Sequence, residues 1–65
     1  MIQSITKFKV KNGNYIEVYI VESHRNGNKT IYKNDSFIGN LKSWFDVEKI
    51  IGIRADKGQT LYTRF

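Results

Sequence analysis

Alternation of polar and apolar residues around a glycine-containing turn is the feature that most constrains this chain. Residues 7–11 alternate lysine with an apolar side chain, and residues 15–22 carry isoleucine or valine at positions 16, 18 and 20. A period of two residues is typical of strands with one buried and one exposed face. Asn12-Gly13-Asn14 lies between the two segments and has the composition of a tight turn. The pattern predicts a β-hairpin near the start of the chain.

The register of this hairpin decides which side chains face the interior. A three-residue loop over residues 12–14 pairs Phe8 with Val18 and Val10 with Ile16, so apolar side chains share one face. A slip of one residue would turn every side chain to the other face. The expected outward face carries the side chains of Lys7, Lys9, Lys11, Tyr15, Glu17 and Tyr19.

A second hairpin is predicted near the end of the chain. Asp56-Lys57-Gly58 is expected to form its three-residue loop, with Gly58 at positive φ. The same register then places Ile53 opposite Leu61 on the inward face. The outward face of this hairpin is expected to carry Arg54, Tyr62 and Arg64.

A third strand and a helix are expected between the two hairpins. The strand covers residues 29–33 and follows a polar turn. Apolar residues at positions 37, 38, 41, 44 and 45 have the spacing of one helical face, which predicts a short helix near residues 36–46, capped by Asp35 or Ser36. Because Gly39 weakens a helix, a short strand at 37–39 and a helix from Asn40 is the alternative.

These elements predict one small domain over residues 1–65 with a mainly β (α+β) fold in the order β-β-β-α-β-β. The antiparallel sheet either stays open with the helix on one face or curls into a small SH3-like or OB-like barrel. The expected core consists of Phe8, Val10, Ile16, Val18, Ile20, Leu41, Trp44, Phe45, Ile51, Ile53 and Leu61.

The composition argues against several classes of protein. The chain has no cysteine and a single histidine, His24 in a polar turn, and it has no glycine-rich phosphate loop. Its longest apolar runs, residues 18–21 and 50–53, are far shorter than the roughly 18 residues that a membrane span needs. We therefore expect a cytoplasmic protein that is not an enzyme, does not enter membranes and holds neither a metal nor a cofactor.

The charge balance favours a polyanionic partner. Eleven lysines and arginines stand against six carboxylates, which gives a net charge of +5. Lysines and arginines that share one face of a strand can bind phosphates, and exposed aromatic rings offer stacking surfaces for bases. The sequence thus predicts nucleic-acid binding through a basic and aromatic sheet face composed of Lys7, Lys9, Lys11, Tyr15, Tyr19, Arg54, Tyr62 and Arg64. The competing interpretation is that the lysines only keep the sheet soluble and its edges unpaired.

A small regulatory or inhibitory protein is the second functional hypothesis. In the expected register, Ile5, Val21 and Ile50 face outward, and apolar groups there need a cover. The cover is a closing barrel strand, a second copy of the chain in a homodimer, or a target protein. The abundance of isoleucine, lysine, asparagine and tyrosine is associated with AT-rich genomes, so an origin in a phage or mobile element belongs to this hypothesis.

Overall fold

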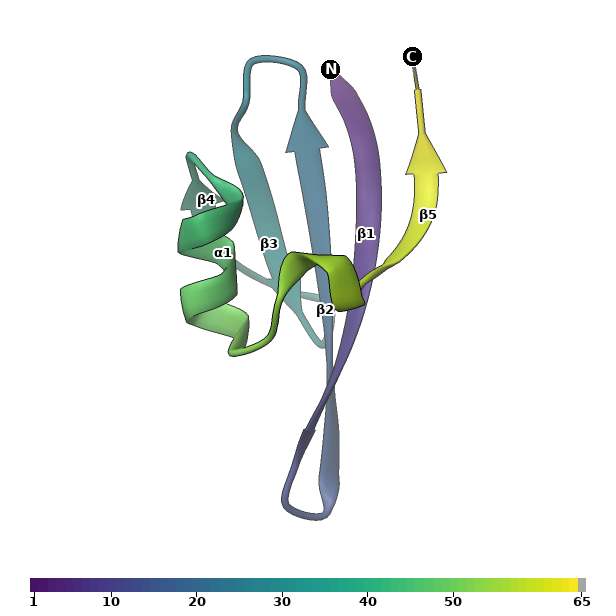
Figure 1. Ribbon diagram of the computed structural model, residues 1–65, viewed down its shortest axis with the longest axis vertical. Coiled ribbons are helices and arrows are strands. Elements are labelled where there is room, and N and C mark those ends of the chain that lie inside the picture. The colour runs from purple at the N-terminus through teal and green to yellow at the C-terminus, as the bar shows by residue number, and fades with distance from the viewer. Residues whose placement is uncertain (65) are drawn as a thin grey trace.

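The fold is a five-stranded antiparallel sheet with one helix packed on one side, as the computed structural model in Figure 1 shows. The structure describes residues 1–64. The mainly β architecture is confirmed, and the sheet stays open, with the strand order β4-β3-β2-β1-β5. The elements are β1 (Ile2–Asn12), β2 (Tyr15–His24), β3 (Lys29–Lys33), β4 (Ser36–Leu41), the helix α1 (Trp44–Ile51), the 3-10 turn η1 (Ala55–Lys57) and β5 (Gln59–Thr63).

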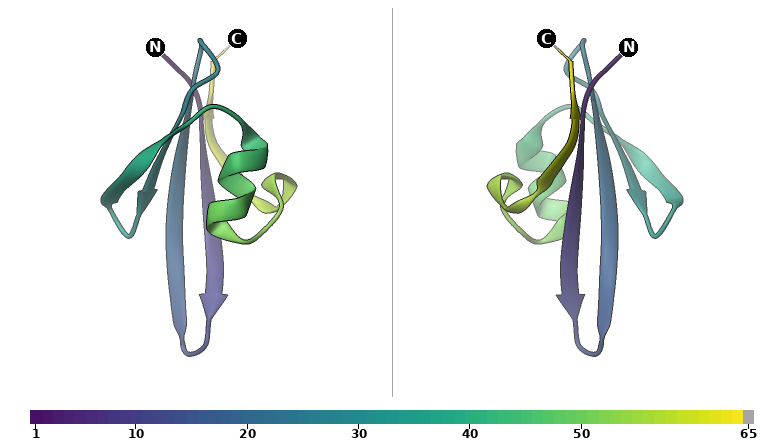
Figure 2. Two further views of the ribbon diagram at one scale, coloured as in Figure 1. Left: turned by 90° about the vertical axis from the view of Figure 1, so that its left-hand side faces the viewer. Right: turned by 90° about the vertical axis from the view of Figure 1, so that its right-hand side faces the viewer.

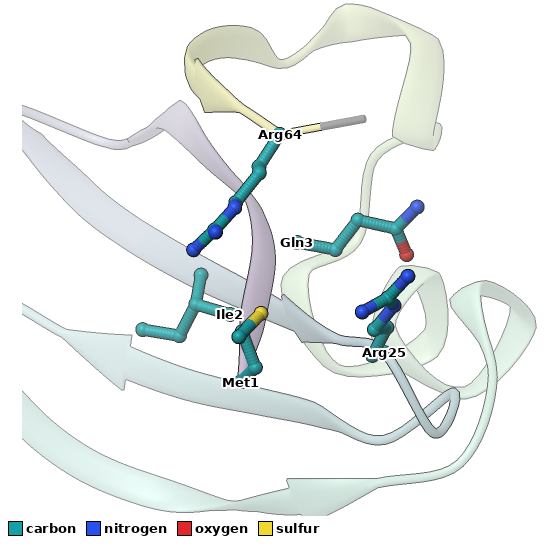
Figure 3. A pocket seen from close by; sticks show the side chains of 5 residues that line it. All are labelled: Met1, Ile2, Gln3, Arg25 and Arg64. Atoms are coloured by element: carbon teal, nitrogen blue, oxygen red, sulfur yellow. The ribbon is translucent and has the colours of Figure 1, made fainter.

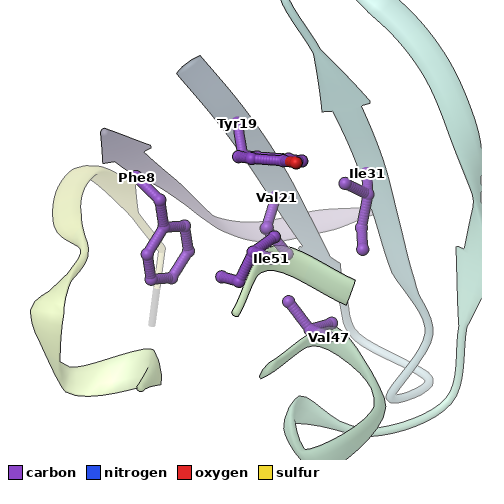
Figure 4. Packing of buried hydrophobic residues seen from close by; sticks show 6 residues of the cluster. All are labelled: Phe8, Tyr19, Val21, Ile31, Val47 and Ile51. Carbon is purple, nitrogen blue, oxygen red and sulfur yellow. The ribbon is translucent and has the colours of Figure 1, made fainter. Parts of the chain in front are cut away.

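The hydrophobic core lies between the sheet and α1, on one side of the sheet only (Figure 2). Phe8 is fully buried and meets Trp44 edge to face, with 6.1 Å between ring centroids. This geometry is one of the two that aromatic pairs prefer. Figure 4 shows the six buried side chains of the core, which are Phe8, Tyr19, Val21, Ile31, Val47 and Ile51.

The β1–β2 hairpin closes with a two-residue turn, not the three-residue loop predicted over residues 12–14. Asn12 pairs with Tyr15, and Gly13 and Asn14 form the turn. Gly13 has a φ of 64°, at the position where tight hairpin turns favour glycine. The predicted register is therefore wrong by one residue.

The shift in register exchanges the two faces of β2. Tyr19 and Val21 face the helix and are buried, and Phe8 is the cross-strand partner of Tyr19. β2 has apolar residues at both odd and even positions, so its sequence did not show which of its two faces packs against the core. Three side chains predicted for the core lie on the opposite side of the sheet: Ile16, Val18 and Ile20.

The segment that was predicted to begin the helix forms β4. Asn34 and Asp35 take φ values of 49° and 69° and make a tight turn between β3 and β4. Both residue types tolerate this left-handed conformation better than most. Gly39 pairs with Ile31 and Phe37 with Tyr32, so the intervening Ile38 is a bulge. The bulge explains why adjacent apolar residues there resemble one face of a helix.

The helix starts at Trp44, because Ser43 provides the cap that Asp35 and Ser36 do not. The Ser43 hydroxyl accepts a hydrogen bond from the Asp46 backbone N–H at 3.3 Å and donates one to its carboxylate at 3.1 Å. Gly52, with a φ of 77°, ends the helix in the left-handed conformation that favours glycine. Phe45, predicted for the core, is 64% exposed on the outer side of this helix.

The predicted second hairpin does not form. Ile50 and Ile51 belong to α1. β5 pairs with β1 and forms the edge of the sheet opposite β4. Leu61 was predicted to face the interior, but it lies at an irregularity of the β1–β5 ladder and is 50% exposed. Gly58 has a φ of −80° and is not a left-handed turn residue.

The need for glycine at position 58 comes from its close approach to the core and not from its backbone conformation. A Cβ atom there would lie 2.5 Å from Thr6 Cγ2 and 2.6 Å from Phe8 Cε2. Gly58→Ala is therefore expected to destabilise the fold by about 1–3 kcal/mol, measured by urea unfolding. Gly39→Ala is the matched control, because no atom lies within 4 Å of its Cβ position and its φ is not positive. Equal effects of the two substitutions would contradict this packing.

An ion pair ties the protruding end of the hairpin to β3 on the helix side of the sheet. Lys33 Nζ lies 2.5 Å from Glu17 Oε2, and the Asn12 amide donates a hydrogen bond to Glu17 Oε1 at 2.9 Å. The bond from Lys33, followed by that from Asn12, lowers the pKa of the Glu17 carboxyl. The same pair raises the pKa of Lys33. Both groups therefore stay charged over the whole neutral pH range.

Candidate nucleic-acid interface

Within residues 1–64, no helix or strand covers the side of the sheet opposite α1. In the right-hand view of Figure 2, the strands face the viewer and the helix lies behind them. Side chains opposite each other in the ladders share this side, which we call the open face. It carries Ile5, Lys7, Lys9, Lys11, Ile16, Val18, Ile20, Tyr32, Phe37 and Tyr62.

Three lysines form a line along β1 on the open face. Lys7, Lys9 and Lys11 alternate with side chains on the helix side, where Phe8 is buried. Successive lysines are separated by two residues, which in a strand corresponds to about 6.8 Å. The alternation predicted for β1 is therefore confirmed.

Aromatic side chains extend this surface across the sheet. Lys7 pairs with Ile20, Ile20 with Tyr32 and Tyr32 with Phe37, so one row crosses four strands. The rings of Tyr32 and Phe37 meet edge to face at a centroid distance of 6.0 Å, and Phe37 is 59% exposed. On the other side of β1, Tyr62 pairs with Ile5. Rings thus lie on both sides of the lysine line.

A hydrogen-bonded polar row lies nearer the β2–β3 turn. The Thr30 hydroxyl donates to Asn40 Oδ1 at 2.7 Å, and it lies 2.9 Å from His24 Nε2. Because the only proton of the hydroxyl is given to Asn40, the bond to His24 requires a proton on Nε2. His24 is therefore held by a neighbouring strand and is not a free turn residue.

The structure brings together part of the predicted site. Lys7, Lys9, Lys11 and Tyr62 share the open face, and Arg64 follows Tyr62 at the end of β5. Tyr19 is excluded, because the register places it in the core with 7% exposure. Tyr15 lies at the hairpin tip on the parity of the helix side, and Arg54 follows α1 and lies 3.4 Å from Asp56.

Sequence reasoning missed the aromatic residues of β3 and β4. Tyr32 lies in a strand that was correctly placed at residues 29–33, but the register of that strand was not determined. Its pairing with Ile20 puts it on the open face, and Phe37 was assigned to a helix. Knowing the register of β3 would have placed Tyr32 on the open face. Placing Phe37 there also required recognising the turn between β3 and β4.

The residues predicted for a protein interface do not form one surface. Val21 is fully buried in the core, which corrects its expected outward position. Ile5 lies on the open face, and Ile50 is 43% exposed on α1. An apolar interface on the open face would instead use Ile16, Val18 and Ile20 of β2.

Residues 1–64 contain no group of three or more histidine, aspartate or glutamate side chains placed to hold a metal ion. Neither α1 nor any other helix in this part of the chain is long and apolar enough to cross a membrane. Comparison of the chain with models of known protein families, with curated proteins and with solved structures finds no match. The residues of the open face are therefore the basis for assigning a function to this protein.

Proposed function

We propose that the protein binds single-stranded nucleic acid across the open face, through phosphate contacts to lysines and stacking of bases on aromatic rings. The observation that carries this proposal is the line of Lys7, Lys9 and Lys11 beside the exposed rings of Phe37 and Tyr62 on an uncovered sheet. This combination of cations and rings is how proteins bind single strands without sequence preference.

The charge of the open face supports this proposal. Glu22 is the one carboxylate on the ladder positions of this face among the described strands, and it lies beside Ile5. The ion-paired Glu17 lies on the helix side. The three lysines therefore face solvent without an adjacent cross-strand acid, because their partners on β2 are isoleucine and valine.

The shape of the face favours single strands. Bases must leave a duplex stack before they lie flat on aromatic side chains, and an exposed sheet offers a broad platform for them. Phe37 and Tyr62 stand near opposite edges of the sheet, so rings are available on both sides of the lysine line. The aliphatic side chains between them provide apolar surface for the bases.

Fluorescence anisotropy with labelled oligothymidylate at several salt concentrations tests this function. With three lysine contacts, the log–log slope of affinity against salt should be about −2, since each single-strand phosphate contact contributes about −0.7. A duplex of the same length should bind more weakly. Absence of binding, or binding that does not respond to salt, would exclude the proposal.

A protein partner on the same face is the second candidate, favoured by the aliphatic row of Ile16, Val18 and Ile20 on β2. Ile16 is 64% exposed, and such rows on monomers often mark interfaces. A second copy of this chain would bring three more lysines to the contact, so an acidic partner fits better. Self-association that does not depend on salt, measured by analytical ultracentrifugation, would favour a homodimer over both nucleic-acid binding and an acidic protein partner.

A further inference from the structure

Two arginines flank the beginning of β1, beyond the lysine line. The backbone N–H of Arg25 donates to Met1 O at 3.0 Å, and that of Arg64 donates to Gln3 O at 2.7 Å. These bonds fix one arginine on each side of β1. The strands on either side of β1 are two strand spacings apart, about 10 Å, so the two arginines approach the beginning of β1 from opposite edges of that strand.

The arginines line one recess of about 150 Å³ together with Met1, Ile2 and Gln3. Figure 3 shows the residues that surround this recess: Arg64 extends toward Ile2 on one side of β1, and Arg25 lies beside Gln3 on the other, with Met1 in the middle. Neither guanidinium forms a salt bridge with a carboxylate in residues 1–64. We call this site the arginine recess.

A second, more apolar depression adjoins the arginine recess on the side of the open face. Its lining includes Ile5, Tyr62 and Arg64, and Met1, Ile2 and Arg64 are shared by both. Tyr62 offers a ring for stacking, and Arg64 lies at the boundary between the two depressions. An aromatic base and the phosphate attached to it therefore find suitable surfaces side by side.

We infer that the arginine recess binds the terminal phosphate of a nucleic-acid strand whose backbone follows β1. This inference rests on the proposed function. A strand along the open face meets Lys11, Lys9 and Lys7 in turn, and then reaches the two arginines where β1 begins. A terminal phosphate carries nearly two negative charges at neutral pH, whereas an internal phosphate carries one, so two guanidinium groups favour the terminal one.

Oligothymidylates of equal length with a 5′-phosphate, a 3′-phosphate or hydroxyl groups at both ends test the inference. One of the phosphorylated forms should bind about tenfold more tightly than the hydroxyl form, as expected for added charge-assisted hydrogen bonds. Arg25→Gln combined with Arg64→Gln should remove this preference, so that the phosphorylated and hydroxyl forms bind with equal affinity. Equal affinity of the unmodified protein for all three oligonucleotides would overturn the inference and leave the proposed function standing.

A matched control and a second measurement separate the remaining outcomes. Arg54→Gln with Lys57→Gln removes the same charge outside the sheet, and it should leave the preference unchanged. If no oligonucleotide binds, the proposed function fails. In that case a two-dimensional NMR titration with thymidine 5′-monophosphate tests whether the arginine recess binds phosphate. Chemical-shift changes confined to Gln3, Arg25 and Arg64 support a phosphate site there, and the absence of such changes overturns the inference.

Discussion

Reversing the charges of Lys7 and Lys9 together is expected to lower the affinity for oligothymidylate on the order of 100-fold at 0.1 M salt. Each single-strand phosphate contact contributes about fivefold at this salt concentration, so losing two contacts costs about 25-fold. The new carboxylates add repulsion to this loss. The salt slope should also become shallower by about 1.4, since two contacts of about 0.7 disappear.

The control for this experiment keeps the total charge equal. Lys42→Glu with Lys57→Glu has the same effect on net charge, but both lysines are exposed and outside the sheet. This variant should lose far less affinity than Lys7→Glu with Lys9→Glu. Equal losses would show that binding depends on net charge alone, and the site assignment would be wrong. Circular dichroism should show that both variants remain folded, because all four side chains lie outside the core.

Truncation of Phe8 is expected to unfold much of the protein. The side chain is fully buried against Trp44, and replacing such a phenylalanine with alanine costs about 3–5 kcal/mol. A domain of 65 residues has a total stability of about 3–10 kcal/mol. Phe8→Ala should therefore lower the midpoint of thermal unfolding by at least about 12 °C, measured by circular dichroism.

Phe45→Ala is the matched control, because it makes the same substitution on the outer side of α1. Phe45 is 64% exposed and contacts Lys49, whose Nζ lies 4.4 Å from the ring centroid. Its removal should cost less than about 1 kcal/mol. The sequence prediction placed both phenylalanines in the core, so similar losses in the two variants would support that prediction and contradict the observed position of α1.

The faces of β1 were predictable because its two parities differ in polarity. Lysine and apolar residues alternate there, and only one arrangement keeps Phe8 from water and Lys9 in it. The neighbouring strand β2 has apolar residues on both parities, with Val18 and Ile20 on one and Tyr19 and Val21 on the other. Its orientation depends on α1, which packs over Tyr19 and Val21, and that contact is not local in sequence.

The position of the helix was partly readable from local signals. Ser43 and Asp46 have the spacing of an N-terminal cap, and Gly52 has the position of a helix stop. These signals were outweighed by apolar spacing that belongs to a bulged strand around Ile38. The return of β5 to β1 joins opposite ends of the chain, and neither its tight approach at Gly58 nor its register is visible in the local pattern.

The strict alternation in β1 also restricts how the length of this chain can vary. A one-residue insertion between Lys7 and Phe8 would exchange the two sides of half the strand, sending cations toward the helix and an aromatic ring into water. An extra residue at Gly13 or Asn14 would only enlarge the loop. Insertions and deletions among natural variants should therefore be concentrated at the turn between β1 and β2 and be rare within β1.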